Sequence, residues 1–88
     1  MSKMPMKMMV ADCFRRGEAL NPGAVHDLIR DHYAGERYCS IESVREHLMS
    51  LKAVGILNDE SSYVDGDGGL VPVYRISEYG LDRLRRAR

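Results

Sequence analysis

The sequence is short of cysteine and of long apolar runs, and each shortage excludes a class of protein. Two cysteines, Cys13 and Cys39, cannot build the disulfide framework of a small secreted domain. No apolar run approaches the ~20 residues of a membrane span. Asp12, Arg15 and Arg16 interrupt the apolar residues near the N-terminus, so we expect no secretory signal. We therefore expect reduced cysteines, no membrane partner and a cytoplasmic protein.

The chain also lacks an excess of charge of either sign. Its 13 Lys and Arg balance its 13 Asp and Glu, and this balance does not by itself favour a nucleic-acid partner. The charges are unevenly placed, because the segment 59–71 holds four acids and no Lys or Arg, whereas 83–88 holds four arginines. A dipolar surface of this kind can still bind DNA through its basic face.

No catalytic or metal-binding motif is recognisable. The three histidines and two cysteines lack the close spacing of zinc ligands, such as C-x-x-C or H-x-x-x-H. No glycine-rich phosphate loop follows a predicted strand, and no nucleophile stands beside a base in a recognisable pattern. We expect no enzyme activity, no cofactor and no metal, with a site between Cys39 and His47 as the alternative left open.

The segment 40–57 is the most regular part of the sequence. Apolar residues at 41, 44, 48, 51 and 54 have the spacing of one helical face. Ser40 is a good N-cap, because its hydroxyl can accept from a free amide of the first turn. Gly55 suits the left-handed residue that follows a helix. The pattern predicts a helix over 40–54, followed by an extended segment that begins at Ile56.

The remaining elements surround this helix in one small domain, 1–88. Apolar stripes predict a first helix over about 5–16 and a second that starts after the cap Asn21 and ends at Gly35. The second helix should bury Val25, Leu28, Ile29 and Tyr33. Strands are expected over 56–65 and 70–77 around a glycine-rich turn, and a last helix over 78–87. Pro72 cannot donate to a strand ladder, so we expect its position to be unpaired. The fold class is mainly α with a small antiparallel β-hairpin, in the order helix-helix-helix-strand-strand-helix.

Three short motifs give this order a family resemblance. The segment 17–22 is similar to the proline entry of the second helix in bacterial winged helix-turn-helix regulators. The segments 40–57 and 74–80 resemble their recognition helix and the exit from their wing. The likeness is to the broad MarR/PadR/ArsR type and covers about 10–88. It implies a winged helix whose helix 40–54 enters the DNA major groove. One departure is the connection 34–39, which is longer than the usual tight turn.

The resemblance makes the helix 40–54 the candidate DNA-reading surface. Arg45, Ser43 and Ser50 are plausible base readers, and Glu46 could accept from a cytosine amino group. Contacts with phosphates are expected from residues on and before the helix. The full candidate set is Arg37, Tyr38, Ser40, Ser43, Arg45, Glu46, Ser50 and Lys52. The alternative interpretation is an ordinary solvated helix face.

Regulators of this type dimerise through their terminal helices, so the resemblance also implies a homodimer. Met6 and Met9 fit the core stripe of the first helix, which leaves Met4 and Met8 for the surface. Exposed methionines suit a helix that packs against a partner subunit. The expected dimer contacts are Met4, Met8 and Leu84. A flexible chain start is the alternative explanation of the exposed methionines.

The expected wing does not favour DNA. Asp65 and Asp67 lie at its tip, where DNA phosphates would repel them. They are explained as turn residues that suit the backbone geometry, with the wing standing clear of DNA. A calcium loop fails on spacing, because Gly69 stands where an oxygen ligand should be. The resemblance carried by 40–57 and 74–80 still leads us to expect a DNA-binding repressor. The alternative function is a protein-interaction module that uses the acidic wing and the mixed face of helix 40–54.

Overall fold

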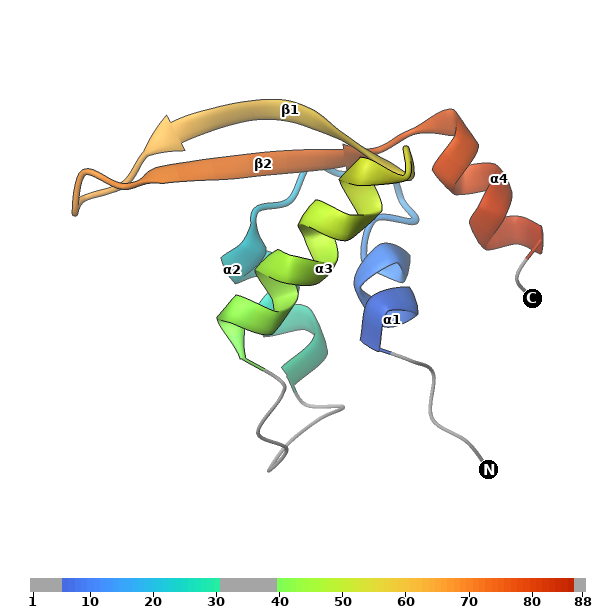
Figure 1. The fold of residues 1–88 in the computed structure, drawn as a ribbon, viewed down its shortest axis with the longest axis horizontal. Helices are drawn as coiled ribbons and strands as arrows, with labels where there is room; N and C mark the ends of the chain where they lie inside the picture. Colours follow the sequence, from blue (N-terminus) through green and yellow to red (C-terminus); the bar gives the residue numbers. More distant parts are fainter. Residues whose placement is uncertain (1–5, 31–39, 87–88) are drawn as a thin grey trace.

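A two-stranded antiparallel hairpin lies across three short helices, and a fourth helix follows it (Figure 1). The computed structural model describes residues 6–30 and 40–86 of the 88-residue chain. Their order is helix-helix-helix-strand-strand-helix, which confirms the expected fold class. The elements are α1 (Met6–Asp12), α2 (Pro22–Ile29), α3 (Ile41–Ala53), β1 (Leu57–Val64), β2 (Leu70–Ile76) and α4 (Glu78–Arg86).

The predicted helix over 40–54 is confirmed as α3, with both of its ends where the sequence placed them. The Ser40 hydroxyl accepts from the Ser43 backbone amide at 3.1 Å and caps the first turn. The apolar stripe buries Val44, Leu48 and Leu51. Gly55 follows with a φ of 85°, a left-handed conformation that glycine adopts without strain.

Helix α2 begins as predicted but buries a narrower stripe. The Asn21 side chain accepts from the amide of Ala24 at 2.8 Å, and proline occupies the first helical position. Val25 and Ile29 are buried, but Leu28 is 55% exposed, so its predicted burial is wrong. The two buried residues are one turn apart, and Leu28 lies about 100° around the helix from Ile29. Tyr33 and Gly35 lie outside the described residues.

Helix α1 is shorter than the predicted 5–16. It ends at Asp12, and the chain continues to Gly17 through turns closed by bonds to the residue three positions earlier, such as Phe14 N to Ala11 O at 3.1 Å. This tighter path places Phe14 fully in the core. Gly17 follows with a φ of 82°. The apolar stripe is confirmed, but its last members, Cys13 and Phe14, lie beyond the end of the helix.

The hairpin pairs Leu57 with Ile76 at its base and Val64 with Leu70 near its tip. The register shifts between Asp59 and Ser61, which leaves an extra residue in β1. The expectation for Pro72 is wrong, because Pro72 stands opposite Ser62 within the register. Backbone groups alternate between the two edges of a strand, so Pro72 directs its missing amide the same way as Tyr74, away from β1.

A short third segment extends the sheet at this outer edge. Leu20 and Tyr74 exchange two backbone hydrogen bonds of 2.9 Å each, forming an isolated antiparallel bridge. The bridge ties the start of α2 to β2. Tyr74 is buried on the side of the helices, and nothing local in the sequence marks Leu20 as its partner.

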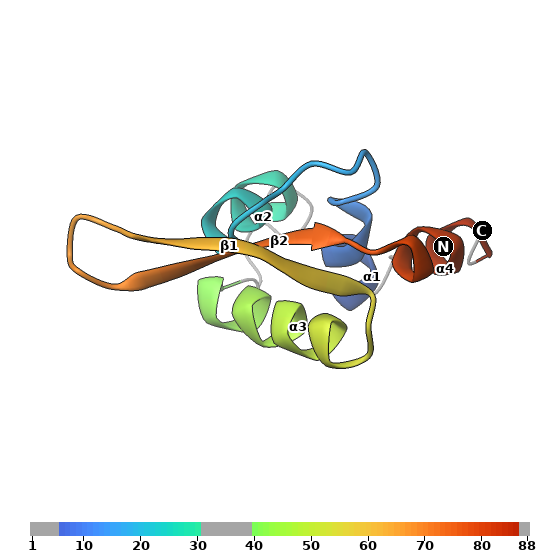
Figure 2. The ribbon, with the colours of Figure 1, turned by 90° about the horizontal axis from the view of Figure 1, so that it is seen from above.

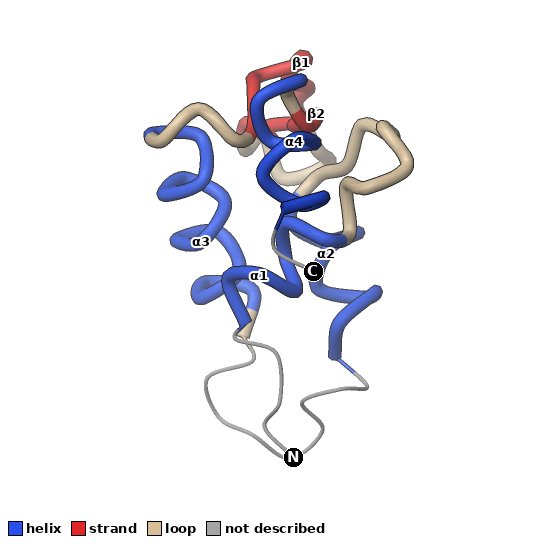
Figure 3. Tube along the Cα trace, turned by 90° about the vertical axis from the view of Figure 1, so that its right-hand side faces the viewer, coloured by secondary structure: helices blue, strands red, loops and turns tan. Residues whose placement is uncertain are grey.

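The core lies between the helices and the base of the hairpin. Phe14, Ile29, Leu48 and Leu57 are its largest fully buried side chains. Figure 3 shows the strands on one side of the molecule, with α3 and α2 on opposite flanks beneath them. Residues 58–70 are all exposed, so the hairpin beyond Leu57 projects as a wing. Figure 2 shows the wing tip and α4 at opposite ends of the molecule. Within the described ranges, no helix is long and apolar enough to cross a membrane.

Candidate nucleic-acid interface

The surface of α3 divides into an outer stripe and two flanks. The outer stripe consists of Glu42, Glu46, Met49 and Ala53, all of which are exposed. Steps of four, three and four residues keep these positions on one side of a helix. The stripe lies opposite the buried residues of α3, and none of its side chains forms an ion pair within the described part of the chain. It is therefore the part of α3 that is open to a partner.

The first flank faces the wing. Arg45 and Lys52 lie two turns apart on it, and both are exposed. Lys52 Nζ lies 2.6 Å from Asp59 Oδ2 on β1, and the hydrogen bond and charge of Asp59 raise the pKa of Lys52. A DNA phosphate would therefore compete with Asp59 for this lysine. Arg45 makes no ion pair with residues 6–30 or 40–86, which leaves it as the available cation of this flank.

The second flank faces α1. Lys7 Nζ donates to Ser50 Oγ at 2.6 Å, and Ser43 and Ser50 are both half-buried. The hydroxyls of Ser40 and Ser43 lie 3.2 Å apart, so the cap already engages them. The predicted serine readers thus border the outer stripe, while Glu46 lies within it. Arg37 and Tyr38 lie outside the described residues.

The acidic wing is organised by its own turn and by two ion pairs. Asp65 Oδ1 accepts from the amides of Asp67 at 2.9 Å and Gly69 at 3.0 Å, which confirms Asp65 as a turn residue. On β1, Asp59 pairs with α3, and Glu60 Oε2 accepts from Arg75 Nε at 2.8 Å. Of the four wing acids, Asp67 alone has no such side-chain role within the described part of the chain.

The wing also exposes apolar surface. Val64 and Leu70 face one another across the hairpin and are 65% and 71% exposed. Tyr63 is 47% exposed, and its hydroxyl accepts from Asn21 Nδ2 at 2.8 Å. This contact ties the middle of the wing to the start of α2. The end of the wing therefore combines aliphatic side chains with a carboxylate-rich turn.

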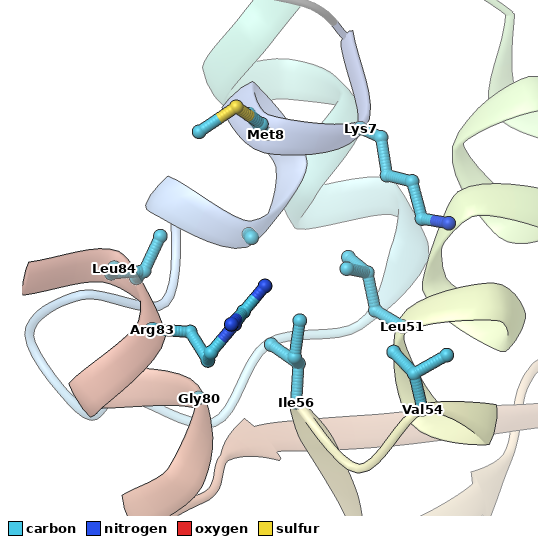
Figure 4. A pocket seen from close by; sticks show the side chains of 9 residues that line it. Lys7, Met8, Leu51, Val54, Ile56, Gly80, Arg83 and Leu84 are labelled. Atoms are coloured by element: carbon cyan, nitrogen blue, oxygen red, sulfur yellow. The ribbon is translucent and has the colours of Figure 1, made fainter. Parts of the chain in front are cut away.

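An apolar hollow of about 380 Å³ separates α4 from α1 and the end of α3 (Figure 4). The predicted dimer contacts Met8 and Leu84 both line it, while Met4 lies outside the described residues. Leu84 is only 7% exposed and belongs to the core of its own chain, whereas Met8 is half-buried. In Figure 4, Arg83 extends from α4 toward the middle of the hollow. The surface available to a partner here is therefore on the side of Met8.

A second hollow, of about 460 Å³, lies between α1 and α2 and includes Cys13. Burial, and secondarily the charge of Asp12, raises the pKa of the Cys13 thiol to about 11. The thiol is therefore protonated near neutral pH, which disfavours it as a metal ligand. Within the described ranges, no group of three or more His, Cys, Asp or Glu side chains could hold a metal ion.

Sequence reasoning missed the contacts that define the two flanks. Lys52 with Asp59 joins α3 to β1, and Lys7 with Ser50 joins α1 to α3. The helical periodicity correctly identified Val44, Leu48 and Leu51 as buried, whereas Ile41 is only half-buried and Val54, at the end of the predicted face, is 56% exposed. It carries no information on which neighbour stands beside each exposed flank, because that depends on how the other elements pack.

Solved structures share this arrangement. A protein from Thermoplasma acidophilum, described as a candidate transcriptional regulator, matches with a TM-score of 0.72 and 16% identity, covering 92% of this chain and 74% of that one. A PadR-like transcriptional regulator from Bacillus cereus matches with a TM-score of 0.68 and 15% identity, covering 92% and 75%. No protein-family model matches the sequence, and no curated protein matches it. The chain has the winged-helix fold of these two structures.

Proposed function

We propose that the protein is a DNA-binding transcriptional regulator that inserts α3 into the major groove. The observation that carries this proposal is the open outer stripe of α3, on a fold shared with two proteins described as regulators. An α-helix fits the major groove, and the second helix of a helix-turn-helix is the one that reads base edges. The protein acts without a cofactor and without enzymatic chemistry, and it resides in the cytoplasm.

Each contact has a proposed role. Arg45 contacts a base edge or a phosphate from the wing side of α3, because it is exposed and carries no ion pair within the described ranges. Lys52, Arg37 and Tyr38 contact phosphates, with Lys52 exchanging Asp59 for DNA. Binding is expected as a homodimer on a two-fold operator, where it acts as a repressor.

The test is a titration of the full chain against random and genomic duplex DNA. Counterion release makes binding through phosphates weaken steeply between about 50 mM and about 200 mM salt. We expect salt-sensitive binding that selects a palindrome. Arg45→Ala should weaken specific binding by about 1–3 kcal/mol. Arg16→Ala is the matched control, because Arg16 is exposed and lies outside α3 and the wing.

Two outcomes would contradict the proposal. Absence of binding to any duplex at about 50 mM salt would rule out DNA as the partner, because electrostatic binding to DNA is strongest at low salt. Equal losses of DNA-binding affinity in the Arg45→Ala and Arg16→Ala variants would show that α3 does not read the DNA. The losses would then reflect only the change in net charge.

A second function is favoured by the end of the wing. Exposed Val64 and Leu70 next to Asp65 and Asp67 form an acidic and apolar surface that suits a basic protein partner. Such an interaction module should keep its complex when Arg45 and Lys52 are both replaced by alanine. It should lose the complex when Val64 and Leu70 are replaced by serine.

A further inference from the structure

The outer stripe of α3 has a composition that restricts which base pairs it can face. Two carboxylates, from Glu42 and Glu46, occupy the half of the stripe near the N-terminus of α3. Met49, which is 64% exposed, and Ala53 occupy the other half. The cations Arg45 and Lys52 lie on the flank instead. A preference of the stripe for particular base pairs rests on the proposed function, in which α3 enters the major groove.

A carboxylate in the major groove is tolerated only where it finds a hydrogen-bond donor, since phosphates repel it elsewhere. Two base groups donate there, the N4 amino group of cytosine and the N6 amino group of adenine. Adenine places its N7 acceptor beside N6, and this acceptor repels a second carboxylate oxygen. Cytosine has no such acceptor on that edge. Glu42 and Glu46 are therefore matched to cytosine.

The apolar half of the stripe is matched to a different feature of the groove. Thymine carries a C5 methyl group there, which apolar side chains contact. Glu46 and Met49 are three residues apart, which is about 4.5 Å along a helix with a rise of about 1.5 Å per residue. Base pairs stack about 3.4 Å apart. Met49 therefore lies within one or two base pairs of the position that faces Glu46.

We propose that the outer stripe makes α3 selective for half-sites in which cytosine faces Glu42 and Glu46, with thymine one or two base pairs beyond, facing Met49. In this arrangement the glutamates set specificity, while the cations of the wing-side flank supply affinity. Glu42 and Glu46, which phosphates of any duplex would repel, thereby favour binding to one sequence.

The experiment selects bound sites from a random duplex library with four full-length proteins. These are the unaltered chain, Glu46→Gln, Met49→Ala and the control Glu18→Gln, which removes an exposed carboxylate outside α3 and the wing. The unaltered chain should prefer cytosine at the position that faces Glu46 by about 5- to 150-fold. Glu46→Gln should shift that position to adenine, because glutamine pairs with N6 and N7 of adenine. It should also bind random DNA more tightly, while Glu18→Gln keeps the original preference.

A second measurement tests the methyl contact. Replacing the selected thymine by deoxyuridine removes only its methyl group. Removal of one buried methyl should weaken binding of the unaltered chain about fourfold. Met49→Ala should be insensitive to the same replacement. Because the two changes delete opposite sides of one contact, their effects should not add.

The outcomes separate this inference from the proposed function. Salt-sensitive binding whose base preference is the same in the unaltered chain and in Glu46→Gln would overturn the inference and leave the DNA-binding proposal standing. Equal sensitivity of both proteins to deoxyuridine would overturn the thymine contact. Absence of DNA binding by every protein at about 50 mM salt would overturn both proposals, and the outer stripe would then be tested against protein partners.

Discussion

At the scale of single residues, the ion pair of Lys52 with Asp59 is the contact that most affects the charge α3 presents to a partner. The side chains of Lys52 and Asp59 are 48% and 57% exposed, so the pair adds little to folding stability. The pair matters because it neutralises Lys52, which lies on the flank of the helix proposed to read DNA. In the proposed function, Asp59 competes with DNA phosphates for Lys52.

Asp59→Asn should release Lys52 for DNA. We expect tighter binding to random duplex DNA and a salt dependence steeper by about one unit, because one more phosphate is neutralised. Both quantities come from titrations at several salt concentrations. Glu60→Gln is the matched control, since it makes the same charge change on the same strand but removes the ion pair of Arg75, which keeps its hydrogen bond to the Gly17 carbonyl. An identical change in both variants would mean that only net charge matters.

The serines of α3 show what residue-level prediction can and cannot do. Helical periodicity correctly leaves Ser43 and Ser50 out of the buried stripe. It cannot reveal that Lys7 donates to Ser50, because the two residues are 43 positions apart along the chain. The prediction of base readers therefore rests on residue type, and only the packing of α1 shows that Ser50 already accepts a hydrogen bond from Lys7.

At the scale of elements, α4 is fixed to the body by its first turn. The Ser77 hydroxyl accepts from the Gly80 amide at 2.9 Å and donates to the Gly55 carbonyl at 2.6 Å, so one side chain joins the end of α3 to the start of α4. Gly80 is buried against the backbone of Ile56. By helix propensity alone Gly80 weakens this turn, whereas the structure shows why a larger residue does not fit there.

Gly80→Ala should destabilise the protein by about 1–3 kcal/mol, because overpacking forces backbone or side-chain shifts. The added Cβ would overlap the Ile56 carbonyl oxygen and stand 2.8 Å from Cγ1 of Ile76. Urea unfolding followed by circular dichroism measures the change. Gly66→Ala is the control, since a Cβ there meets no atom within 4 Å and should change stability by less than about 0.5 kcal/mol. Equal effects of the two substitutions would show that the Ile56 contact is not limiting.

At the scale of the whole molecule, the surfaces with proposed roles are distributed along one axis. The described residues span 42 × 33 × 20 Å, with the acidic wing at one end and α4 at the other. The outer stripe of α3 faces away from the core between these ends. A homodimer formed beside α4 would therefore leave the wing and the outer stripe of each copy exposed.

Sedimentation equilibrium should give a mass of twice the 10.0 kDa of one chain. Met8→Glu should shift the equilibrium toward monomer, because it places a charge on the apolar surface beside α4. Met49→Glu is the control, since Met49 lies on the outer stripe of α3. A dimer would predict half-sites separated by about 34–36 Å. A monomeric mass at every concentration would contradict the dimer.

Local signals in the chain are enough to establish the order of the elements and the limits of α3. Caps, glycine stops and apolar periodicity act over a few neighbouring residues, so Ser40, Gly55 and the glycine-rich turn can be recognised directly. Tertiary packing determines where α1 ends, that Leu28 is exposed, that Leu20 pairs with Tyr74 and which element borders each flank of α3. These features arise from contacts between segments distant in the chain, whose relative positions are fixed only when the core packs.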